Sequence, residues 1–528
     1  MSLALLILIA APLAAGLASL RVPTRRAMER LQLANAAVLW AAMAAVVAGV
    51  GLKGAVSFGA LLRADPLSAF MDVMLAFIGG TALCYAVGYM GEELTRGHLG
   101  FLRYRRFFVY FDLFLFAMML AVNLDNIALM WIAVEASTIS AALSVGFDRT
   151  KAALEAGWKY IILNFVGIAL ALFGTVLVYY TAEHALGVSM DALSWTALHR
   201  AAGSTDGGLN PVVLKMAFVF AMIGYGTKAG VAPMHTWLPD AHAEAPTPTS
   251  AMLSGLMLNL GLYAVLRLKG LIDPAVGPAF TGSIMLGMGL LSMAIAAAFM
   301  LIQRDYKRLL GYSSVEHVGI ALIGFGVGGP LGLFGGLFHM LNHALAKSAA
   351  FYAAGMVLLR HGHKMIERVT GLVRLAPAAG SGLLLAAVAL AGLPPFGLFV
   401  SELLIAAAAY RHHQGIALLF LGLLALAFAT LLAPLTRMTF AEPIHGDTVQ
   451  SKPIHDDAVQ DKSLHGGAAH DRPSEDARPV TAGPDRLMLS ALGINLAAMS
   501  VTGLLLPIMA SDWLLPVSAL LDAKAGLP

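Results

Sequence analysis

Charged residues are scarce in this sequence. Only 12% of its 528 residues are charged and 59% are hydrophobic, whereas a soluble domain of average composition has about 25% charged residues. This scarcity excludes an ordinary globular enzyme. The net charge is only +3, and no basic patch has interleaved aromatic residues, so we expect no nucleic-acid partner.

Cysteine is nearly absent. The only one, Cys84, lies inside an apolar stretch, which excludes an intramolecular disulfide and a cysteine-bound metal cluster. We therefore expect no cofactor, no resident metal and no catalytic residue in this chain. Any redox chemistry would take place in another subunit.

Long apolar stretches are what the sequence has in abundance. Stretches of about 20 residues, enough to cross a hydrocarbon core of about 30 Å, recur along the whole chain. None alternates in polarity as a barrel strand does, so helices must satisfy the backbone. The sequence predicts an all-α polytopic membrane protein with about fourteen spans, at 2–20, 33–53, 66–90, 107–124, 126–147, 158–180, 211–231, 249–268, 280–302, 309–328, 331–359, 380–409, 415–437 and 487–510.

Lysine and arginine collect in alternate loops, at 21–30, 96–106, 149–151, 304–308 and 360–374. Cytoplasmic loops carry such an excess, so these loops are predicted to face the cytoplasm of a bacterial cell and both termini to lie outside the inner membrane. The first stretch has no preceding basic residue and is followed by Arg21, the reverse of a secretory signal. We expect it to remain as the first membrane helix.

Residues 441–486 interrupt the membrane pattern with a polar, proline-containing segment. A decapeptide recurs there as PIHGDTVQSK, PIHDDAVQDK and a diverged SLHGGAAHDR, with His445, His455 and His465 at a constant interval. A histidine repeat has a metal-binding interpretation, but a short polar repeat is more typical of a flexible linker.

Two predicted helices contain glycine and proline beside one ionisable residue. Lys228 lies in GYGTKAGVAPMHTWLPDA and Glu402 in ALAGLPPFGLFVSELL. Broken helices at corresponding positions of two halves indicate the binding site of an inverted-repeat transporter. The alternative is two unrelated proline kinks, which membrane helices tolerate.

Glu135 lies mid-helix in LMWIAVEASTISAALSVGF, and Lys228 follows two spans later. A charge at the bilayer centre costs about 2.5–3.5 kcal/mol and usually marks a pathway. Burial favours the neutral form of a lysine and a nearby carboxylate favours the charged form, so a movable partner lets the lysine bind and release a proton. The alternative is a static ion pair, although such pairs stabilise poorly compared with apolar packing.

His339, His343 and Lys347 recur every four residues in GLFHMLNHALAKSAAF and so share one helical face, with about 6 Å of rise per step. Histidines at this spacing suit a proton relay. They would also suit a metal, but Lys347 would repel a cation and the glutamate of an H-E-x-x-H motif is missing.

Further titratable residues support the relay. Glu316 and His317 in YSSVEHVGI add an acid and a base. Lys159 and Asp112 are secondary candidates, because their positions near helix ends are typical of anchoring or snorkelling side chains.

Three segments resemble a known family: KAGVAPMHTWLPDAHAEAPTPTSAMLSG from Lys228, RDYKRLLGYSSVEHVG from Arg304 and HMLNHALAKS from His339. They are similar to the antiporter-like, proton-translocating membrane subunits of respiratory complex I, energy-converting hydrogenases and multisubunit cation/proton antiporters. The resemblance extends over about 65–437 and is strongest to the hydrogenase-type subunits of formate hydrogenlyase-like complexes.

The resemblance implies fourteen helices with two broken helices and two inverted five-helix repeats. The implied divisions are N-terminal helices (1–106), first repeat (107–268), second repeat (280–437), linker (441–486) and last helix with tail (487–528). It assigns roles in proton transfer by motif to Glu135, Lys228, His339, His343, Lys347 and Glu402. Asn259 departs from the pattern because many members have a lysine or histidine there, and ordered water would have to bridge this position.

The implied function is proton translocation by a non-catalytic subunit of an oxidoreductase complex that also contains membrane and peripheral subunits. Two alternatives remain open. One is sodium/proton exchange, since carboxylates and freed carbonyls at helix breaks also coordinate Na⁺. The other is a membrane anchor or coupling subunit for a soluble partner, in which the buried charges carry no transport.

Overall fold

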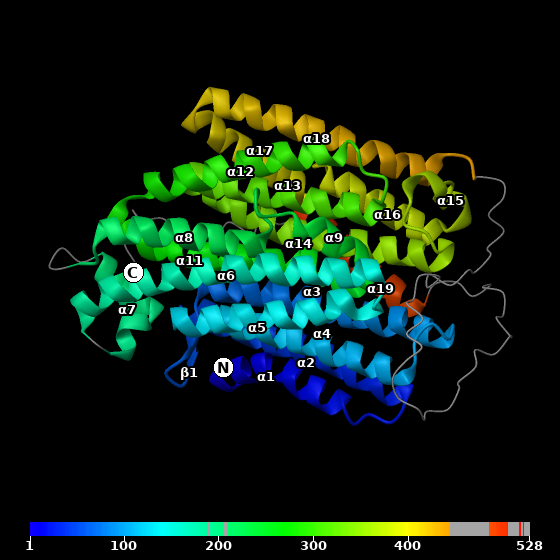
Figure 1. Cartoon of the computed structure of the whole chain (residues 1–528), viewed down its shortest axis with the longest axis horizontal. Coiled ribbons are helices and arrows are strands. Elements are labelled where there is room, and N and C mark those ends of the chain that lie inside the picture. Colours follow the sequence, from blue (N-terminus) through cyan, green and yellow to red (C-terminus); the bar gives the residue numbers. More distant parts are fainter. Residues whose placement is uncertain (188, 204–207, 444–484, 505–516, 519–520, 522–528) are drawn as a thin grey trace.

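The computed structural model describes residues 1–187, 189–203, 208–443, 485–504, 517–518 and 521. In these residues the regular structure is almost entirely helical, and the long helices run side by side along the longest axis of the molecule (Figure 1). The predicted all-α fold class is confirmed. The predicted linker histidines, His445, His455 and His465, lie outside the described residues.

The N-terminal helices are α1 (Ser2–Ser19), α2 (Arg25–Lys53) and α3 (Pro66–Thr95). A short antiparallel hairpin of β1 (Val56–Phe58) and β2 (Leu62–Ala64) joins α2 to α3. Thr24 and Asp65 begin α2 and α3 by accepting backbone N–H groups through their side chains, which satisfies amides that have no partner inside the helix.

The middle of the chain forms α4 (Phe101–Val122), α5 (Ile127–Val145), η1 (Gly146–Asp148), α6 (Lys151–Leu186), η2 (Met190–Leu193), α7 (Trp195–Ala202), α8 (Pro211–Ala229), α9 (Trp237–Glu244), α10 (Thr247–Met252), η3 (Leu253–Met257) and α11 (Leu258–Val276). The turn η3 is π-helical and lies within the otherwise continuous run from α10 to α11. Such single π turns are frequent at functional sites.

The remaining elements are α12 (Pro278–Met300), α13 (Tyr306–Val327), α14 (Gly329–His361), η4 (Ile366–Arg368), α15 (Leu372–Leu375), α16 (Pro377–Leu390), α17 (Gly397–His412), α18 (Gln414–Phe440) and α19 (Arg486–Leu504). Helix α14 is central, because it packs against α3, α10, α13, α16, α17 and α19. Its polar side chains are therefore surrounded by protein on most sides.

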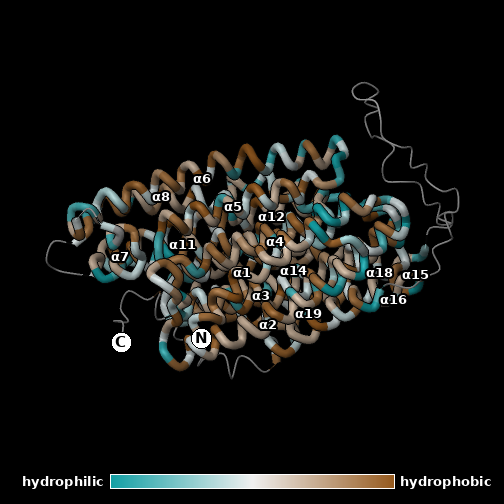
Figure 2. The backbone as a smooth tube through the Cα atoms, turned by 90° about the horizontal axis from the view of Figure 1, so that it is seen from below, coloured by the Kyte–Doolittle hydropathy of each residue, from teal (hydrophilic) through white to brown (hydrophobic). Residues whose placement is uncertain are grey.

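Eleven helices in the described residues are long and apolar enough to cross a membrane. Hydrophobic residues predominate along them, as Figure 2 shows. The other three expected spans are helical as well. Span 107–124 overlaps α4, which ends at Val122, and span 331–359 falls in α14, whereas 380–409 is divided between α16 and α17. The protein is a multi-pass membrane protein.

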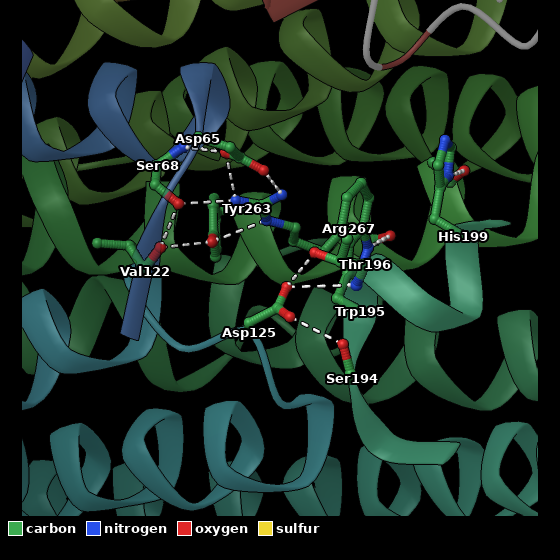
Figure 3. A network of polar contacts seen from close by, with 11 residues as sticks. Asp65, Ser68, Val122, Asp125, Ser194, Trp195, Thr196, His199, Tyr263 and Arg267 are labelled. Atoms are coloured by element: carbon green, nitrogen blue, oxygen red, sulfur yellow. Dashed lines mark hydrogen bonds and ion pairs between the residues drawn. The ribbon is translucent and has the colours of Figure 1, made fainter. Parts of the chain in front are cut away.

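The hairpin and α7 lie at one end of the bundle, and α15 lies at the other (Figure 1). At the hairpin end a network of polar contacts joins α3, α7 and α11 (Figure 3). Arg267 of α11 pairs with Asp65, donates to Ser68 Oγ at 2.7 Å, and lies over the ring of Trp195 at 4.8 Å. This buried network fixes the ends of three elements relative to one another.

Candidate functional site

The first helix break separates α8 from α9. Helix α8 ends at Ala229, and Gly230 follows with φ +76°, a conformation that glycine adopts freely. Lys228 is therefore the penultimate residue of α8, and it is almost completely buried. Its ammonium donates a hydrogen bond to Thr138 Oγ1 at 2.6 Å.

Thr138 and Glu135 are one turn apart on α5, so both face the end of α8. Among the described residues, Lys228 and Glu135 form no ion pair within 4.0 Å, and neither carboxylate oxygen of Glu135 has a hydrogen-bond partner. The two groups nevertheless interact electrostatically. The Thr138 hydroxyl thus holds the Lys228 ammonium one helical turn away from Glu135.

The second break separates α16, which ends at Leu390, from α17, which begins at Gly397. Gly392 has φ +64°, and the Glu402 carboxylate packs directly against it, so a side chain at residue 392 would displace the carboxylate. Glu402 is buried, and its Oε1 atom has no hydrogen-bond partner among the described residues. Each break thus brings a positive-φ glycine together with one buried ionisable group.

Three histidines meet between α13 and α14. His317 Nδ1 lies 3.1 Å from His339 Nε2, and the ring centroids of His317 and His343 are 4.9 Å apart. His339 Nδ1 is 3.0 Å from Ser401 Oγ on α17. The predicted histidine face of α14 therefore contacts His317, and polar contacts connect α13, α14 and α17.

Glu402 lies beside this cluster. One ligand-type atom from each of His317, His339 and Glu402 falls within 4.8 Å of the others. This donor set resembles a divalent-metal site, but hydrogen-bonded imidazoles next to a carboxylate also have the geometry that proton transfer requires.

Lys347 is completely buried and lies one helical turn after His343 on α14. It donates to Leu310 O at 2.7 Å and to Ser313 Oγ, both on α13. Glu316 of α13 interacts electrostatically with Lys347 and with Glu402. The predicted acid thus interacts both with Lys347 and with the ionisable residue of the second helix break.

Asn259 is buried near the start of α11, as a bridge between the two halves would require. Its Nδ2 donates to Gly255 O at 2.7 Å, and its Oδ1 has no partner among the described residues. One turn earlier, Ser254 Oγ lies 2.8 Å from Ser314 Oγ of α13. A pair of hydroxyls therefore connects η3 to the residue next to Ser313.

His242 is a residue that our sequence analysis missed. It is completely buried on α9, stacks on Phe351 with ring centroids 5.3 Å apart, and has no hydrogen-bond partner for either ring nitrogen in the described residues. Both Lys347 and Lys307 interact with it electrostatically. His242 is the first residue of HAEAPTP, within the family-like segment that begins at Lys228. Its position in that segment was the sequence signal that could have identified it.

The two secondary candidates differ from each other. Lys159 lies at the surface as expected and pairs with Glu155 at 2.6 Å and Asp240 at 3.2 Å. The prediction that Asp112 lies near a helix end is wrong, because Asp112 is in the middle of α4. Asp112 is completely buried and accepts hydrogen bonds from Gln32 at 2.9 Å and Asn35 at 3.0 Å, both on α2. These two amides satisfy the carboxylate inside the bundle.

Comparison with known proteins gives the same assignment. Residues 125–428 match the family described as NADH:quinone oxidoreductase/Mrp antiporter, TM. The hydrogenase-4 component F homolog of Methylacidiphilum infernorum (isolate V4) is 42% identical over 390 residues, covering 74% of this chain and 81% of the relative. Hydrogenase-4 component B of Escherichia coli (strain K12) is 31% identical over 356 residues, covering 65% of this chain and 50% of the relative.

A chain in the solved structure of the membrane-bound sulfane sulfur reductase, an archaeal respiratory membrane complex, superposes with a TM-score of 0.80. It is 22% identical, covers 99% of both chains, and therefore shows the shared fold alone. Fold and buried charges together define an antiporter-like membrane subunit of the hydrogenase and complex I type. The chain belongs to the NADH:quinone oxidoreductase/Mrp antiporter membrane family, as its motifs predicted.

Proposed function

We propose that this chain moves protons across the bacterial inner membrane as a non-catalytic subunit of a multisubunit, redox-driven complex. The observation that carries the proposal is the contact between His317 Nδ1 and His339 Nε2 at 3.1 Å, deep inside the bundle. Two imidazoles at this distance are within hydrogen-bond range, so one ring can donate a proton to the other. Packing alone gives no reason to bury such a pair, because apolar side chains would fill the space at a lower desolvation cost.

In the first half, Lys228 and Glu135 form the loading site. The ammonium is held by the Thr138 hydroxyl at 2.6 Å, and neither oxygen of the Glu135 carboxylate has a hydrogen-bond partner among the described residues. Approach of the carboxylate favours the charged lysine, and its withdrawal favours the neutral one. A shift of this pair therefore binds or releases a proton.

The bridge between the halves is made of hydroxyls and water. Asn259 does not titrate, but its free Oδ1 is a hydrogen-bond acceptor for water, and the Ser254–Ser314 contact continues toward Ser313 beside Lys347. Hydroxyls pass protons by exchanging their hydrogen-bond direction, because each one donates and accepts. The missing titratable residue at 259 thus does not interrupt the path.

In the second half, Lys347 passes the proton to the histidine cluster, and His339 passes it through Ser401 to Glu402 at the second break. His339 Nδ1 lies 3.0 Å from Ser401 Oγ, and Ser401 precedes Glu402 on α17. Glu316 supplies the charge that stabilises a proton on Lys347. His242 provides a branch from Lys347 toward Lys307 at the α15 end of the bundle.

The architecture that fits this path has fourteen crossings, including α4, α14 and the broken helix α16–α17. Two inverted repeats, 107–268 and 280–437, each contribute one broken helix. The two broken helices run in opposite directions, since α8 starts from the α7 end of the bundle and α16 from the α15 end. Both termini then lie outside, and the linker 441–486 lies in the cytoplasm.

Redox work done in a partner subunit would drive the path by moving the buried pairs. The relatives of this chain are named as components of hydrogenase and respiratory complexes. Such a complex would explain why the chain buries so many titratable groups. The partner subunits are thus expected to include a peripheral oxidoreductase and further membrane subunits.

Proton uptake by inverted vesicles that contain the assembled complex tests this proposal. In Na⁺-free buffer the wild type is expected to pump, and His339→Ala is expected to pump at background rate with normal assembly. His363→Ala is the matched control, because His363 is exposed in the loop after α14. Transport that requires Na⁺ would support sodium/proton exchange instead, and full pumping by His339→Ala would support the anchor alternative.

A further inference from the structure

A pocket of about 210 Å³ opens at the surface between α4, α5 and α6. It lies where α4 and α6 begin and α5 ends, which is the end of the bundle predicted to face the cytoplasm. The pocket is amphipathic. It is lined by three arginines, by three aromatic residues, and by Ala142, Leu143, Gly146, Leu154, Gly157 and Ile161.

Three arginines line this pocket, and two of them are unpaired. Arg103 donates to Phe147 O at 2.8 Å, lies over the Phe147 ring at 5.1 Å, and is 4.0 Å from the Asp148 carboxylate. The side chains of Arg106 and Arg149 are exposed and have no hydrogen bond or ion pair with any described residue. Two guanidinium groups are therefore available for an anion.

The backbone holds Arg149 in an unusual conformation. Its φ is +56°, and it is the only residue other than glycine with a positive φ in the described part of the chain. Arg149 is the C-cap residue of η1, and this left-handed conformation costs a residue with a Cβ more than it would cost glycine.

Trp158 gives an independent indication of what occupies the pocket. Its side chain is 64% exposed on the pocket wall, one helical turn past Leu154 on α6. Tryptophan is enriched at the boundary between hydrocarbon and water, because its ring has both an apolar surface and a polar N–H group. Trp158 therefore indicates that the pocket lies at that boundary. Arg103, Arg106 and Arg149 lie near the helix ends, and Ile161 lies further along α6.

We propose that this pocket binds the headgroup of an anionic glycerophospholipid. Arg106 and Arg149 hold the phosphate, Arg103 adds positive charge above the apolar floor, and Leu143, Leu154 and Ile161 contact the acyl chains. Basic pockets between helices on the cytoplasmic side have the charge that such headgroups require. This inference depends on the orientation of the chain in the membrane and does not depend on the proton path.

Charge and position together favour a lipid over a peripheral protein. A peripheral protein would reach only the water side of the pocket, whereas the exposed apolar side chains and Trp158 would continue into the hydrocarbon layer. A free phosphate ion would use the arginines and leave the apolar wall without a function. The lipid uses both parts of the pocket.

The test is native mass spectrometry of the purified full-length complex after exchange into vesicles of dioleoyl phosphatidylglycerol and dioleoyl phosphatidylcholine. The test variant is Arg106→Gln/Arg149→Gln. The matched control is Arg26→Gln/Arg30→Gln, which removes the same charge from exposed arginines at the start of α2, at the same end of the bundle. Removing two basic contacts is expected to weaken phosphatidylglycerol binding about 30-fold.

We expect the wild type and the control to retain one more phosphatidylglycerol per chain than the test variant. Equal retention by all three proteins, or an equal loss in test variant and control, would overturn the proposal. Displacement of the lipid by millimolar inorganic phosphate would show a free anion site and would also overturn it. The proposal would also be overturned if another subunit covered the pocket in the intact complex and no lipid were bound there.

Discussion

Replacing Arg267 with leucine is expected to destabilise the fold by about 3–5 kcal/mol, because the substitution leaves the buried Asp65 carboxylate without its cation. The guanidinium donates to Asp65 Oδ1 at 2.7 Å, to Ser68 Oγ at 2.7 Å and to Tyr263 OH at 2.8 Å. It also lies over the Trp195 ring, a contact worth roughly 0.5–2 kcal/mol (Figure 3). Leucine replaces none of these contacts.

A double-mutant cycle separates the ion pair from the rest of the network. Asp65→Asn in the Arg267→Leu background removes the unpaired charge, so the double variant should be more stable than the single Arg267→Leu variant by about 1–3 kcal/mol. The assay is unfolding of the purified protein in mixed micelles with increasing denaturant. Arg200→Leu, an exposed arginine on the neighbouring α7, is the control and should change stability by less than about 0.5 kcal/mol.

Additive effects of the two substitutions would refute this reasoning, since residues in one ionic network must couple. Equal destabilisation by Arg200→Leu would also refute it. Loss of an exposed arginine would then destabilise the fold as much as loss of the buried one, so the buried contacts of Arg267 would not explain its effect.

Other expected outcomes concern the proposed path and the linker. His339→Ala and His343→Ala should each impair proton pumping about as much as the double variant, because consecutive steps give non-additive losses; additive defects would indicate separate roles. His242→Phe should slow pumping by about tenfold or more at unchanged assembly if the histidine branch carries protons, and normal pumping would remove it from the path. A Gly/Ser replacement of residues 441–486 should pump normally, and loss of pumping in an assembled complex would show that the linker has a coupling role.

The membrane fold could be predicted from the sequence because the signals are local. The lengths of the apolar stretches predicted the spans. The glycine and proline residues after Lys228 and before Glu402 predicted the two helix breaks, which the structure has at 230–236 and 391–396. The shared face of His339 and His343 also follows from helical spacing alone.

Contacts between distant helices could not be predicted in this way. No local signal shows that the Thr138 hydroxyl contacts Lys228, or that His317 meets His339, because both depend on how helices pack. Asp112 was misjudged for the same reason. Its partners Gln32 and Asn35 lie on α2, nearly eighty residues away in the sequence.

The most direct test of the account is proton pumping by Lys228→Arg, measured in inverted vesicles and normalised to assembled protein. Arginine keeps the positive charge but does not release its proton at accessible pH. Lys215→Arg is the control, because Lys215 is exposed on the same helix and lies over the Phe280 ring outside the proposed path. We predict background pumping for Lys228→Arg and normal pumping for the control. Normal pumping by Lys228→Arg would contradict the account, because Lys228 would then serve only as a fixed charge.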